Sequence, residues 1–317
     1  MKPPYDITNK ILKLVQQVSV KLGEINAAHL HKPSLELRKR NRIKTVQASL
    51  EIEGNTLTEE QITALLENKR ILGPKKDIDE VINALKVYDA IHTYKPSSLN
   101  SFLSAHKTLM EGLIKDAGKL RTQGVGIIKG SKVLAPPASN LKFLVEDLFD
   151  YLENDDDLVL IKSCVAHYEL EFIHPFMDGN GRMGRLWQTV ILMSKYPVFE
   201  YLPFETMVKK RQAEYYAVLS ACDKTGKSTR FIEFMLEVLD DTLADLLQSQ
   251  NRTMNQAERL AYFIAMTSQK EFKRKDYLNL FKDISSATAS RDLKAGVNQK
   301  LFAKKGDKRT AIYQILV

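Results

Sequence analysis

Residues 174–185 run His-Pro-Phe-Met-Asp-Gly-Asn-Gly-Arg-Met-Gly-Arg and stand between two stretches with helical periodicity. Apolar residues recur every three or four positions over about 157–172 and again over 182–195, which predicts an amphipathic helix on each side. Gly179 and Gly181 let the connection adopt backbone conformations that other residues avoid. The stretch therefore predicts a tight turn that leads into the N-terminus of a helix.

The same helical period covers most of the chain, so the predicted fold class is mainly α. Thr58 and Gln61 have the spacing of a capping box, which predicts a helix over about 58–68. Further helices are expected over 78–93, 99–114, 140–153, 205–221 and 229–249. The exception is a β-prone stretch, 125–129 and 132–134, which predicts a small hairpin.

Composition places the chain among globular proteins. It has 317 residues, of which 44% are hydrophobic. There is no apolar run of about 18 residues, as a membrane helix requires, and Met1–Lys10 lacks the apolar centre of a signal peptide, so we expect a soluble, cytoplasmic protein without membrane contact. Cys164 and Cys222 lie in apolar helical patterns without metal-ligand spacing, which favours buried thiols over a disulfide or a zinc site.

The glycine turn and the helix after it have the composition of a phosphate site. Successive backbone N–H groups of such a turn can point at one anion, and a helix N-terminus adds partial positive charge. Arg182 and Arg185 lie three residues apart, hence on one helical face, and their planar guanidinium groups suit bidentate contacts with phosphate oxygens. Two arginines at one turn indicate a polyphosphate. The predicted nucleotide site comprises Asp178, Gly179, Asn180, Gly181, Arg182, Met183, Gly184 and Arg185.

Two residues of the stretch can take part in chemistry. Asp178 offers a hard oxygen ligand of the kind that Mg²⁺ accepts when it also binds substrate phosphates. His174, as an imidazole with an ordinary pKa of about 6.5, can accept a proton from a hydroxyl placed beside the phosphate. A glycine-rich helix connection with surface arginines is the alternative, but so many constrained positions favour a site for a nucleoside triphosphate with Mg²⁺.

The stretch resembles the signature of the Fic protein family, His-x-Phe-x-Asp/Glu-Gly-Asn-Gly-Arg-x-x-Arg, with every fixed position present. Members of that family are mainly helical and transfer AMP from ATP to a Ser, Thr or Tyr hydroxyl of a target protein, with release of pyrophosphate. The resemblance implies that His174 is the base, Asp178 the Mg²⁺ ligand and Asn180 a residue that positions the α-phosphate. Arg182 and Arg185 would hold the outer phosphates. The expected partners are ATP and a target protein, or the chain itself.

A second short motif, Ser49-Leu-Glu-Ile-Glu53-Gly54, precedes the signature. It is similar to the inhibitory motif of the same family, Ser/Thr-x-x-x-Glu followed by Gly or Asn, which lies on an N-terminal helix in relatives of this order. The resemblance pairs Glu53 with Arg185, so the carboxylate would take the guanidinium that a γ-phosphate needs and leave ATP poorly oriented. On the residues alone, Glu53 is equally well explained as a solvated residue near a helix end that Gly54 terminates.

Two further assignments rest on the resemblance. Relatives carry a flap at the expected hairpin, whose exposed strand edge can bind an extended substrate segment; this adds Gly126, Ile127 and Ile128 to the site. A hairpin that closes one side of the bundle explains the same pattern. Tyr215 stands where relatives place an aromatic residue beside the nucleotide, although packing is the alternative for it and for Tyr216.

Positive charge gathers at the C-terminal end. The formal net charge is +8, and residues 255–317 hold 13 Lys and Arg against 6 Asp and Glu, a surplus of +7. Helices over 277–281 and 285–294 and short strands at 301–302 and 311–316 are similar to a winged helix-turn-helix, a fold that also serves in protein docking. Candidates for contacts with a DNA backbone are Arg291, Lys294, Lys300, Lys304, Lys305, Lys308 and Arg309.

The sequence is compatible with three functional hypotheses. The leading hypothesis is an autoinhibited, Mg²⁺-dependent protein adenylyltransferase with 1–73 as regulatory segment, 74–250 as catalytic core and 255–317 as winged module. The second keeps the site but removes AMP from modified proteins, with Glu53 orienting water. The third is a DNA-binding regulator whose nucleotide pocket acts as a sensor. The target, the modified residue and the oligomeric state, a homodimer included, are left open.

Overall fold

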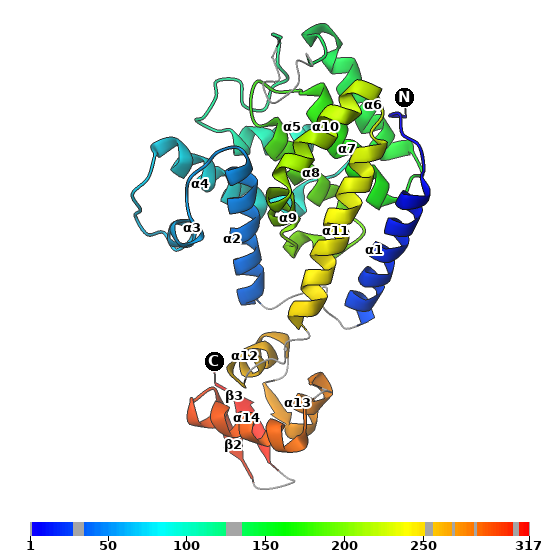
Figure 1. The fold of residues 1–317 in the computed structure, drawn as a ribbon. Helices are drawn as coiled ribbons and strands as arrows, with labels where there is room; N and C mark the ends of the chain where they lie inside the picture. The colour runs from blue at the N-terminus through cyan, green and yellow to red at the C-terminus, as the bar shows by residue number, and fades with distance from the viewer. Residues whose placement is uncertain are drawn as a thin grey trace. The chain divides into compact units, whose positions relative to one another are not determined.

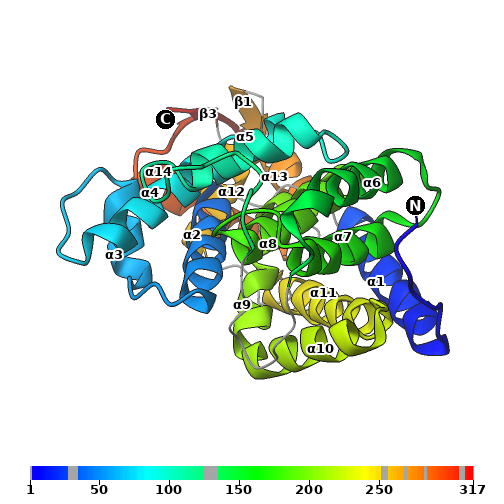
Figure 2. The same ribbon diagram turned by 90° about the horizontal axis from the view of Figure 1, so that it is seen from above.

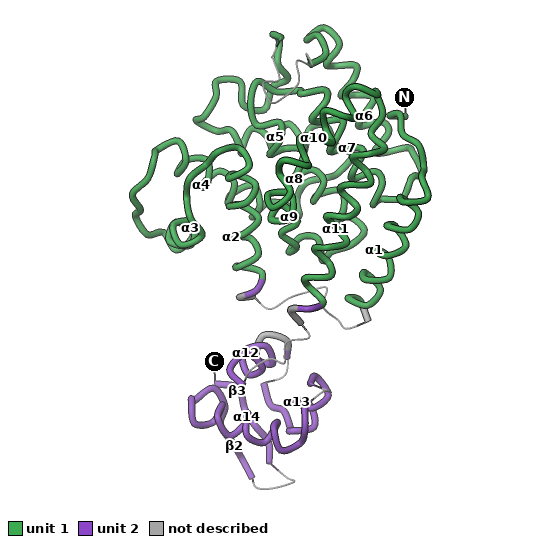
Figure 3. The backbone as a smooth tube through the Cα atoms, viewed as in Figure 1, with its two compact units in different colours: residues 1–33, 38–247 green, residues 34–37, 248–317 purple. Residues whose placement is uncertain are grey.

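The computed structural model describes residues 2–27, 35–124, 135–250, 256–267, 270–281, 284–306 and 311–316. The chain divides into two compact units, which we call unit 1 (residues 1–33 and 38–247) and unit 2 (residues 34–37 and 248–317; Figure 3). The predominantly helical fold class is confirmed (Figure 1). The expected hairpin falls on 125–134, outside the described residues.

Unit 1 consists of α-helices and short 3-10 helices, of which the first residues of α2 and the last of α11 are assigned to unit 2. In chain order these are α1 (Asn9–Ala27), α2 (Leu35–Ile52), α3 (Glu59–Leu66), α4 (Lys75–Asp89), η1 (Ile91–Thr93), α5 (Leu99–Leu109), η2 (Ala138–Asn140), α6 (Leu141–Asn154), α7 (Val159–Ile173), α8 (Asn180–Met193), η3 (Pro197–Tyr201), α9 (Phe204–Lys210), α10 (Gln212–Thr225) and α11 (Thr229–Gln250). Among the described helices, none is both long and apolar enough to cross a lipid bilayer.

Local sequence accounts for several helix boundaries. The Thr58 side chain accepts from the Gln61 N–H, and the Gln61 side chain accepts from the Thr58 N–H at 3.0 Å, so the expected capping box starts α3. The single helix expected over 205–221 was wrong in one respect, because the helix breaks at Arg211, between α9 and α10. α10 ends at Gly226, which has a left-handed φ of 64° and therefore closes the helix at no steric cost.

Helix α8 lies among the other helices of unit 1 (Figure 2). It touches α2 through a hydrogen bond from Arg185 to Ser49, and α4 through an ion pair of Arg182 with Glu80. On the α5 side the Trp187 ring packs edge-on against a phenylalanine ring. Because α7 and α8 are buried along most of their length, the connection between them is fixed from several sides.

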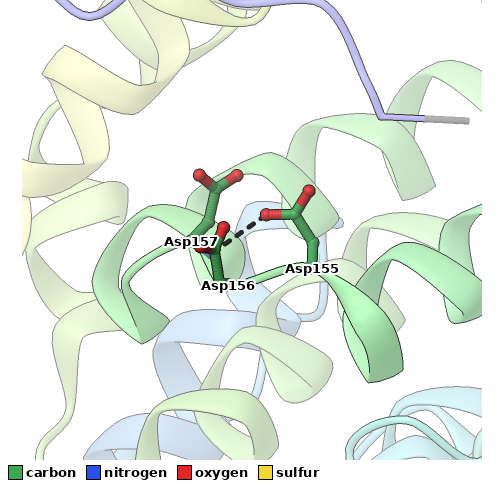
Figure 4. Close-up of side chains that lie close together, drawn as sticks. All are labelled: Asp155, Asp156 and Asp157. Atoms are coloured by element: carbon green, nitrogen blue, oxygen red, sulfur yellow. Dashed lines mark hydrogen bonds between the residues drawn. The ribbon is translucent and has the colours of Figure 1, made fainter.

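Three consecutive aspartates, Asp155–Asp157, connect α6 and α7, with carboxylate oxygens within 4.8 Å of one another (Figure 4). Lys2 Nζ lies 2.7 Å from Asp157 Oδ1 and 3.3 Å from Asp155 Oδ1. The hydroxyls of Tyr5 and Tyr151 both donate to the second oxygen of Asp157. These contacts tie the N-terminal residues to unit 1, so we assign the cluster a structural role.

Unit 2 contains α12 (Gln256–Met266), β1 (Glu271–Lys273), α13 (Arg274–Leu280), α14 (Ser286–Asn298), β2 (Phe302–Lys305) and β3 (Ile312–Ile315). Its sheet is antiparallel in the order β1-β3-β2, with Phe272 opposite Tyr313. Asp292 is buried and accepts two hydrogen bonds from the Arg259 guanidinium, at 2.6 and 3.0 Å. Sequence periodicity predicted α13, α14 and both C-terminal strands, but it missed α12 and the three-residue strand β1.

Candidate functional site

The connection from α7 to α8 is a loop closed by its own residues. His174 ends α7 with a left-handed φ of 51°, and Gly179 precedes α8 with a φ of 85°. The Asn180 side chain accepts from the Phe176 N–H and donates to the Phe176 carbonyl, both at 2.9 Å. The Asn180 side chain thus holds the loop together, while the first backbone N–H groups of α8 have no acceptor within the helix and can meet an anion.

Each glycine of the signature lies so close to another residue that a side chain would not fit, and the neighbouring residue differs from one glycine to the next. A Cβ on Gly179 would lie 2.8 Å from Met110 Sδ, and a Cβ on Gly184 would lie 2.7 Å from the His167 ring. At Gly181 a Cβ would lie 2.5 Å from Glu53 Oε1. Gly181 therefore leaves open the space in which Glu53 approaches the start of α8, whereas the other two permit close packing.

Arg121 holds the backbone of the loop through its guanidinium group. The sequence analysis did not identify it as a site residue. It is 3% exposed, and its guanidinium donates to four carbonyl oxygens. The distances are 2.7 Å to His174, 2.9 Å to Gln123, 2.6 Å to Pro136 and 3.3 Å to Ile173. This buried cation fixes the backbone on which the candidate base sits.

His106 of α5 supports the other end of the loop and was also missed. Its ring stacks on Phe176 with centroids 3.5 Å apart. Nδ1 accepts from the Gly118 N–H at 2.9 Å, so Nε2 carries the proton and donates to the Asp178 carbonyl at 3.0 Å. Burial lowers the pKa of His106 to about 4, and the ring therefore stays neutral.

His174 has the geometry of a base. Its Nδ1 lies 3.3 Å from the Glu171 carbonyl, which can only accept, so the proton sits on Nδ1 and Nε2 has a free lone pair. Burial lowers the pKa of His174. The imidazole is therefore neutral at pH 7 and able to accept a proton.

Arg182 and Asp178 meet at the entrance to the loop. Arg182 is 4% exposed and pairs with Glu80 of α4 at 3.2 Å and with Asp178 Oδ1 at 3.4 Å. The Asp178 side chain is 53% exposed, and its Oδ1 also accepts from the Gly179 N–H. A single exposed carboxylate at a phosphate cradle fits Mg²⁺, which usually keeps several waters and takes its other ligands from substrate phosphates.

Arg185 connects the signature to α2. It is fully buried; its Nη2 lies 3.0 Å from Glu53 Oε1 and donates to the Ser49 carbonyl, while Nε donates to the Ser49 hydroxyl at 3.1 Å. Gly54 follows with a φ of 96° and ends the helix. Nη1 of Arg185 has no hydrogen-bond partner within the described part of the chain. A buried guanidinium N–H without a partner has the capacity to donate to an anion that enters the site.

The two neighbouring tyrosines of α10 differ in environment. Tyr215 is 1% exposed, and its hydroxyl lies 2.9 Å from Glu171 Oε1 and 3.0 Å from His167 Nε2. Tyr216 instead borders an open cavity of about 840 Å³, lined further by Ala217, Ser220, Ala221, Lys224, Thr225 and Arg230. Met183 is fully buried in the apolar core, and Gly126, Ile127 and Ile128 lie outside the described residues.

Comparison with known proteins places this geometry in a family. The family model "Fic/DOC family" matches residues 96–192. The structure of a Fic family protein from Desulfovibrio desulfuricans G20 is 38% identical and covers 99% of this chain and 98% of its own, with a TM-score of 0.77. The chain belongs to the Fic family.

Two eukaryotic relatives are more distant. Protein adenylyltransferase fic-1 of Caenorhabditis briggsae is 32% identical over 206 residues, which is 60% of this chain and 38% of that protein. The structure of a Fic-1 fragment from C. elegans, at 22% identity and a TM-score of 0.64, shares the fold over 76% of this chain and 73% of its own. The chain thus spans well under half the length of the C. briggsae relative.

Proposed function

We propose that this chain is a protein adenylyltransferase that moves AMP from ATP to a hydroxyl side chain of a protein. The proposal is carried by three groups that meet at the start of α8. They are the neutral His174 imidazole, whose Nε2 can accept a proton, the turn with Gly179 and Gly181, which we call the glycine cradle, and the buried Arg185 guanidinium, whose Nη1 has no partner among the described residues. The names of the curated relatives, protein adenylyltransferases, support the same activity.

The residues of the loop divide the reaction between them. His174 Nε2 accepts the proton of the incoming hydroxyl as its oxygen attacks the α-phosphorus. The new oxygen–phosphorus bond replaces the bond to the β-phosphate oxygen, and pyrophosphate leaves. The N-terminus of α8 and Arg185 stabilise the phosphate charge. Asp178 would hold Mg²⁺, which when bound neutralises the oxygens of the leaving group.

Tyr216 is the aromatic residue that we place beside the base of the nucleotide. It lines the cavity on α10, whereas the buried Tyr215 is engaged with Glu171 and His167. A base has a flat face that stacks on a tyrosine ring. The position of Tyr216 therefore supports base stacking better than that of its neighbour.

We propose further that residues 1–73 include an inhibitory device. The Glu53 carboxylate lies on the guanidinium of Arg185 that an outer phosphate requires. A carboxylate and a phosphate compete for the same N–H groups, so ATP that binds with Glu53 in place is held in a poor orientation for attack. ADP needs no γ-phosphate contact and would still bind.

Replacement of Glu53 tests both parts of the proposal. With labelled ATP and Mg²⁺, we expect Glu53→Gly to modify itself at least about tenfold more than wild type, since loss of a charged hydrogen bond corresponds to roughly 1.5–3 kcal/mol. Glu51→Gly is the matched control, because Glu51 lies on the same helix and pairs with Lys209 instead.

A second variant separates the test of the base from the test of the inhibition. His174→Ala in the Glu53→Gly background should abolish labelling. Labelling that persists without His174 would contradict the base, and a signal unchanged by Glu53→Gly would contradict the inhibition. Mass spectrometry of cell-extract proteins after incubation with the Glu53→Gly chain identifies the target and the modified side chain.

Removal of AMP by the same site is the second candidate, and the placement of Glu53 supports it. Its carboxylate reaches the space above Gly181, where it can orient a water molecule towards a phosphorus held in the cradle. Wild-type chain that releases AMP from a modified protein, with Glu53→Gly inactive in release, would favour removal. Release by neither chain would exclude it.

For unit 2 we propose a winged helix that binds double-stranded DNA. The exposed positions of α14, including Arg291 and Lys294, alternate with its buried positions Ala289, Leu293 and Gly296, so the basic residues share the helix face that points outward. Lys300, Lys304 and Lys305 are also exposed, whereas Lys308 and Arg309 lie outside the described residues.

A salt titration tests this surface. We expect the affinity of the full chain for a mixed-sequence duplex to fall steeply with salt concentration. The double variant Arg291→Glu with Lys294→Glu should lower the slope of log affinity against log salt by about two, one for each lost phosphate contact. Lys142→Glu, on α6 of unit 1, is the matched charge control. Affinity independent of salt would exclude contacts with the phosphate backbone.

A further inference from the structure

The last four carbonyl groups of α2 find their hydrogen-bond donors in different parts of unit 1. The final carbonyls of a helix have no N–H partner inside the helix, so donors must come from elsewhere. The carbonyls of Leu50 and Glu51 accept from backbone N–H groups of the turn that follows. The Ser49 carbonyl accepts from Arg185 Nη2 at 3.0 Å. The remaining carbonyl, that of Ile52, directly precedes the inhibitory glutamate and meets a side chain from α10.

That side chain is Gln212, the first residue of α10. Its Nε2 donates to the Ile52 carbonyl at 3.1 Å, and its Oε1 accepts from Lys209 Nζ at 3.1 Å. A carbonyl can only accept and an ammonium group can only donate, so both partners require this orientation of the amide. Lys209 also pairs with Glu51 at 3.4 Å. The corner between α9 and α10 is therefore connected to the last turn of α2 at two neighbouring residues.

The contact with Gln212 fixes the peptide unit that leads into Glu53. The Ile52 carbonyl and the Glu53 N–H belong to one rigid, planar unit. Its oxygen is held by Gln212, and its N–H donates to the Leu50 carbonyl at 3.0 Å. Arg185 is the group on which we propose that a phosphate binds, so its own contacts with α2 change when a phosphate arrives. The hydrogen bond from Gln212 lies outside that exchange.

We infer that Gln212 is a positioning residue for the inhibitory carboxylate. One N–H of its amide sets the direction of the peptide that leads into Glu53, and with it the strength of the contact between Glu53 and Arg185. The inference rests on the inhibition proposed above. In the described part of the chain, the side-chain hydrogen bonds of Gln212 go to Ile52 and Lys209. Loss of this donor therefore leaves the loop at 174–179, with its base and cradle, in place.

The isosteric change Gln212→Glu tests the inference with little change in packing. It replaces the donor with a carboxylate oxygen, which repels the Ile52 carbonyl, and it keeps an oxygen for Lys209. With labelled ATP and Mg²⁺, we expect self-modification roughly three- to tenfold above wild type, the range that corresponds to one hydrogen bond. Gln212→Ala should give a smaller increase, because the Ile52 carbonyl then meets water in place of a carboxylate.

The effect of Gln212 must pass through Glu53. In the Glu53→Gly background, Gln212→Glu should leave self-modification unchanged, because no inhibitory carboxylate remains to be positioned. Gln47→Glu is the matched control, since Gln47 is a half-buried residue of α2 and the change of charge is the same. An increase with Gln47→Glu as large as that with Gln212→Glu would overturn the inference. A further increase in the Glu53→Gly background would overturn it as well.

Hydrogen exchange gives a second readout that needs no nucleotide. The N–H groups of Glu53 and Gly54 donate within the turn that ends α2, at 3.0 Å each. Both should exchange faster in Gln212→Glu than in wild type, while the amides of residues 38–46 keep their rates.

Unchanged exchange at Glu53 and Gly54 would overturn the inference. So would unchanged self-modification by Gln212→Glu beside an increase with Glu53→Gly. If Glu53→Gly shows no labelling at all, the proposed function fails instead, and the exchange rates still decide whether Gln212 holds the end of α2.

Discussion

The loop at 174–179 and helix α2 both reach the same site, but they are held in different ways. The loop is fixed by buried groups of unit 1: the Arg121 guanidinium, the His106 ring and the Asn180 amide. α2 reaches the site through Ser49 and Glu53, both on Arg185, and the Glu53 side chain is 28% exposed.

The difference indicates how the proposed inhibition can be reversed. None of the loop contacts named above involves α2, so displacement of Glu53 leaves the loop, the base and the cradle in place. What changes is the set of anions around Arg185. Damage to the loop and smaller changes at its neighbours should therefore separate the two regions by experiment.

The largest effect should come from Arg121→Ala. The change leaves the carbonyls of His174, Ile173 and Pro136 without their donor, and buried polar groups without partners are costly, so we expect the free energy of unfolding to fall by about 3 kcal/mol or more. Urea denaturation measures the loss, and transfer in the Glu53→Gly background should disappear with it. Arg70→Ala, at an exposed position of unit 1, is the control. Unchanged stability would show that the loop is held by other means.

Tyr216→Ala should weaken nucleotide binding without disturbing the loop. Loss of base stacking corresponds to about 1–3 kcal/mol, so KM for ATP should rise roughly tenfold or more in the Glu53→Gly chain while kcat changes little. Initial-rate kinetics measure both. An unchanged KM would show that the adenine base does not bind in the cavity on α10.

Ser49→Ala tests α2 at its second contact. Arg185 Nε loses one neutral acceptor, but the Ser49 carbonyl and Glu53 remain, so self-modification should rise only a few-fold, about 1 kcal/mol or less. Labelling with ATP, side by side with Glu53→Gly, ranks the two contacts. An increase as large as that of Glu53→Gly would show that Ser49 carries the inhibition.

The pH profile should show the smallest change. His174 must be neutral to act as a base, and burial lowers its pKa, so protonation begins only below its ordinary value. Under saturating ATP, kcat of the Glu53→Gly chain should stay level from neutral pH down to about pH 6.5 and fall below it. A decline that begins above neutral pH would argue against this imidazole as the base.

The features that the sequence predicted are those encoded by residues close together in the chain. The glycines and arginines of the signature are contiguous, the Thr58 capping box spans four residues, and periodicity revealed most helices. The predicted pairing of Glu53 with Arg185 has its geometric counterpart in the structure, and the inhibitory role stays a prediction.

Other features depend on contacts that no local pattern marks. Arg121, His106 and Glu80 lie between about 50 and 100 residues before their partners. The different environments of Tyr215 and Tyr216 depend on the rotation of α10, since adjacent helical residues point about 100° apart. β1 has three residues, too few for an alternation to be visible.

The most direct test of the account is a crystal structure of the Glu53→Gly chain with Mg²⁺ and the α,β-methylene analogue of ATP. We predict the γ-phosphate on Arg185 in the space that Glu53 leaves, the loop unchanged, and His174 Nε2 facing the side of the α-phosphorus opposite the leaving group. An α-phosphate outside the glycine cradle, or an imidazole turned away from it, would contradict the account.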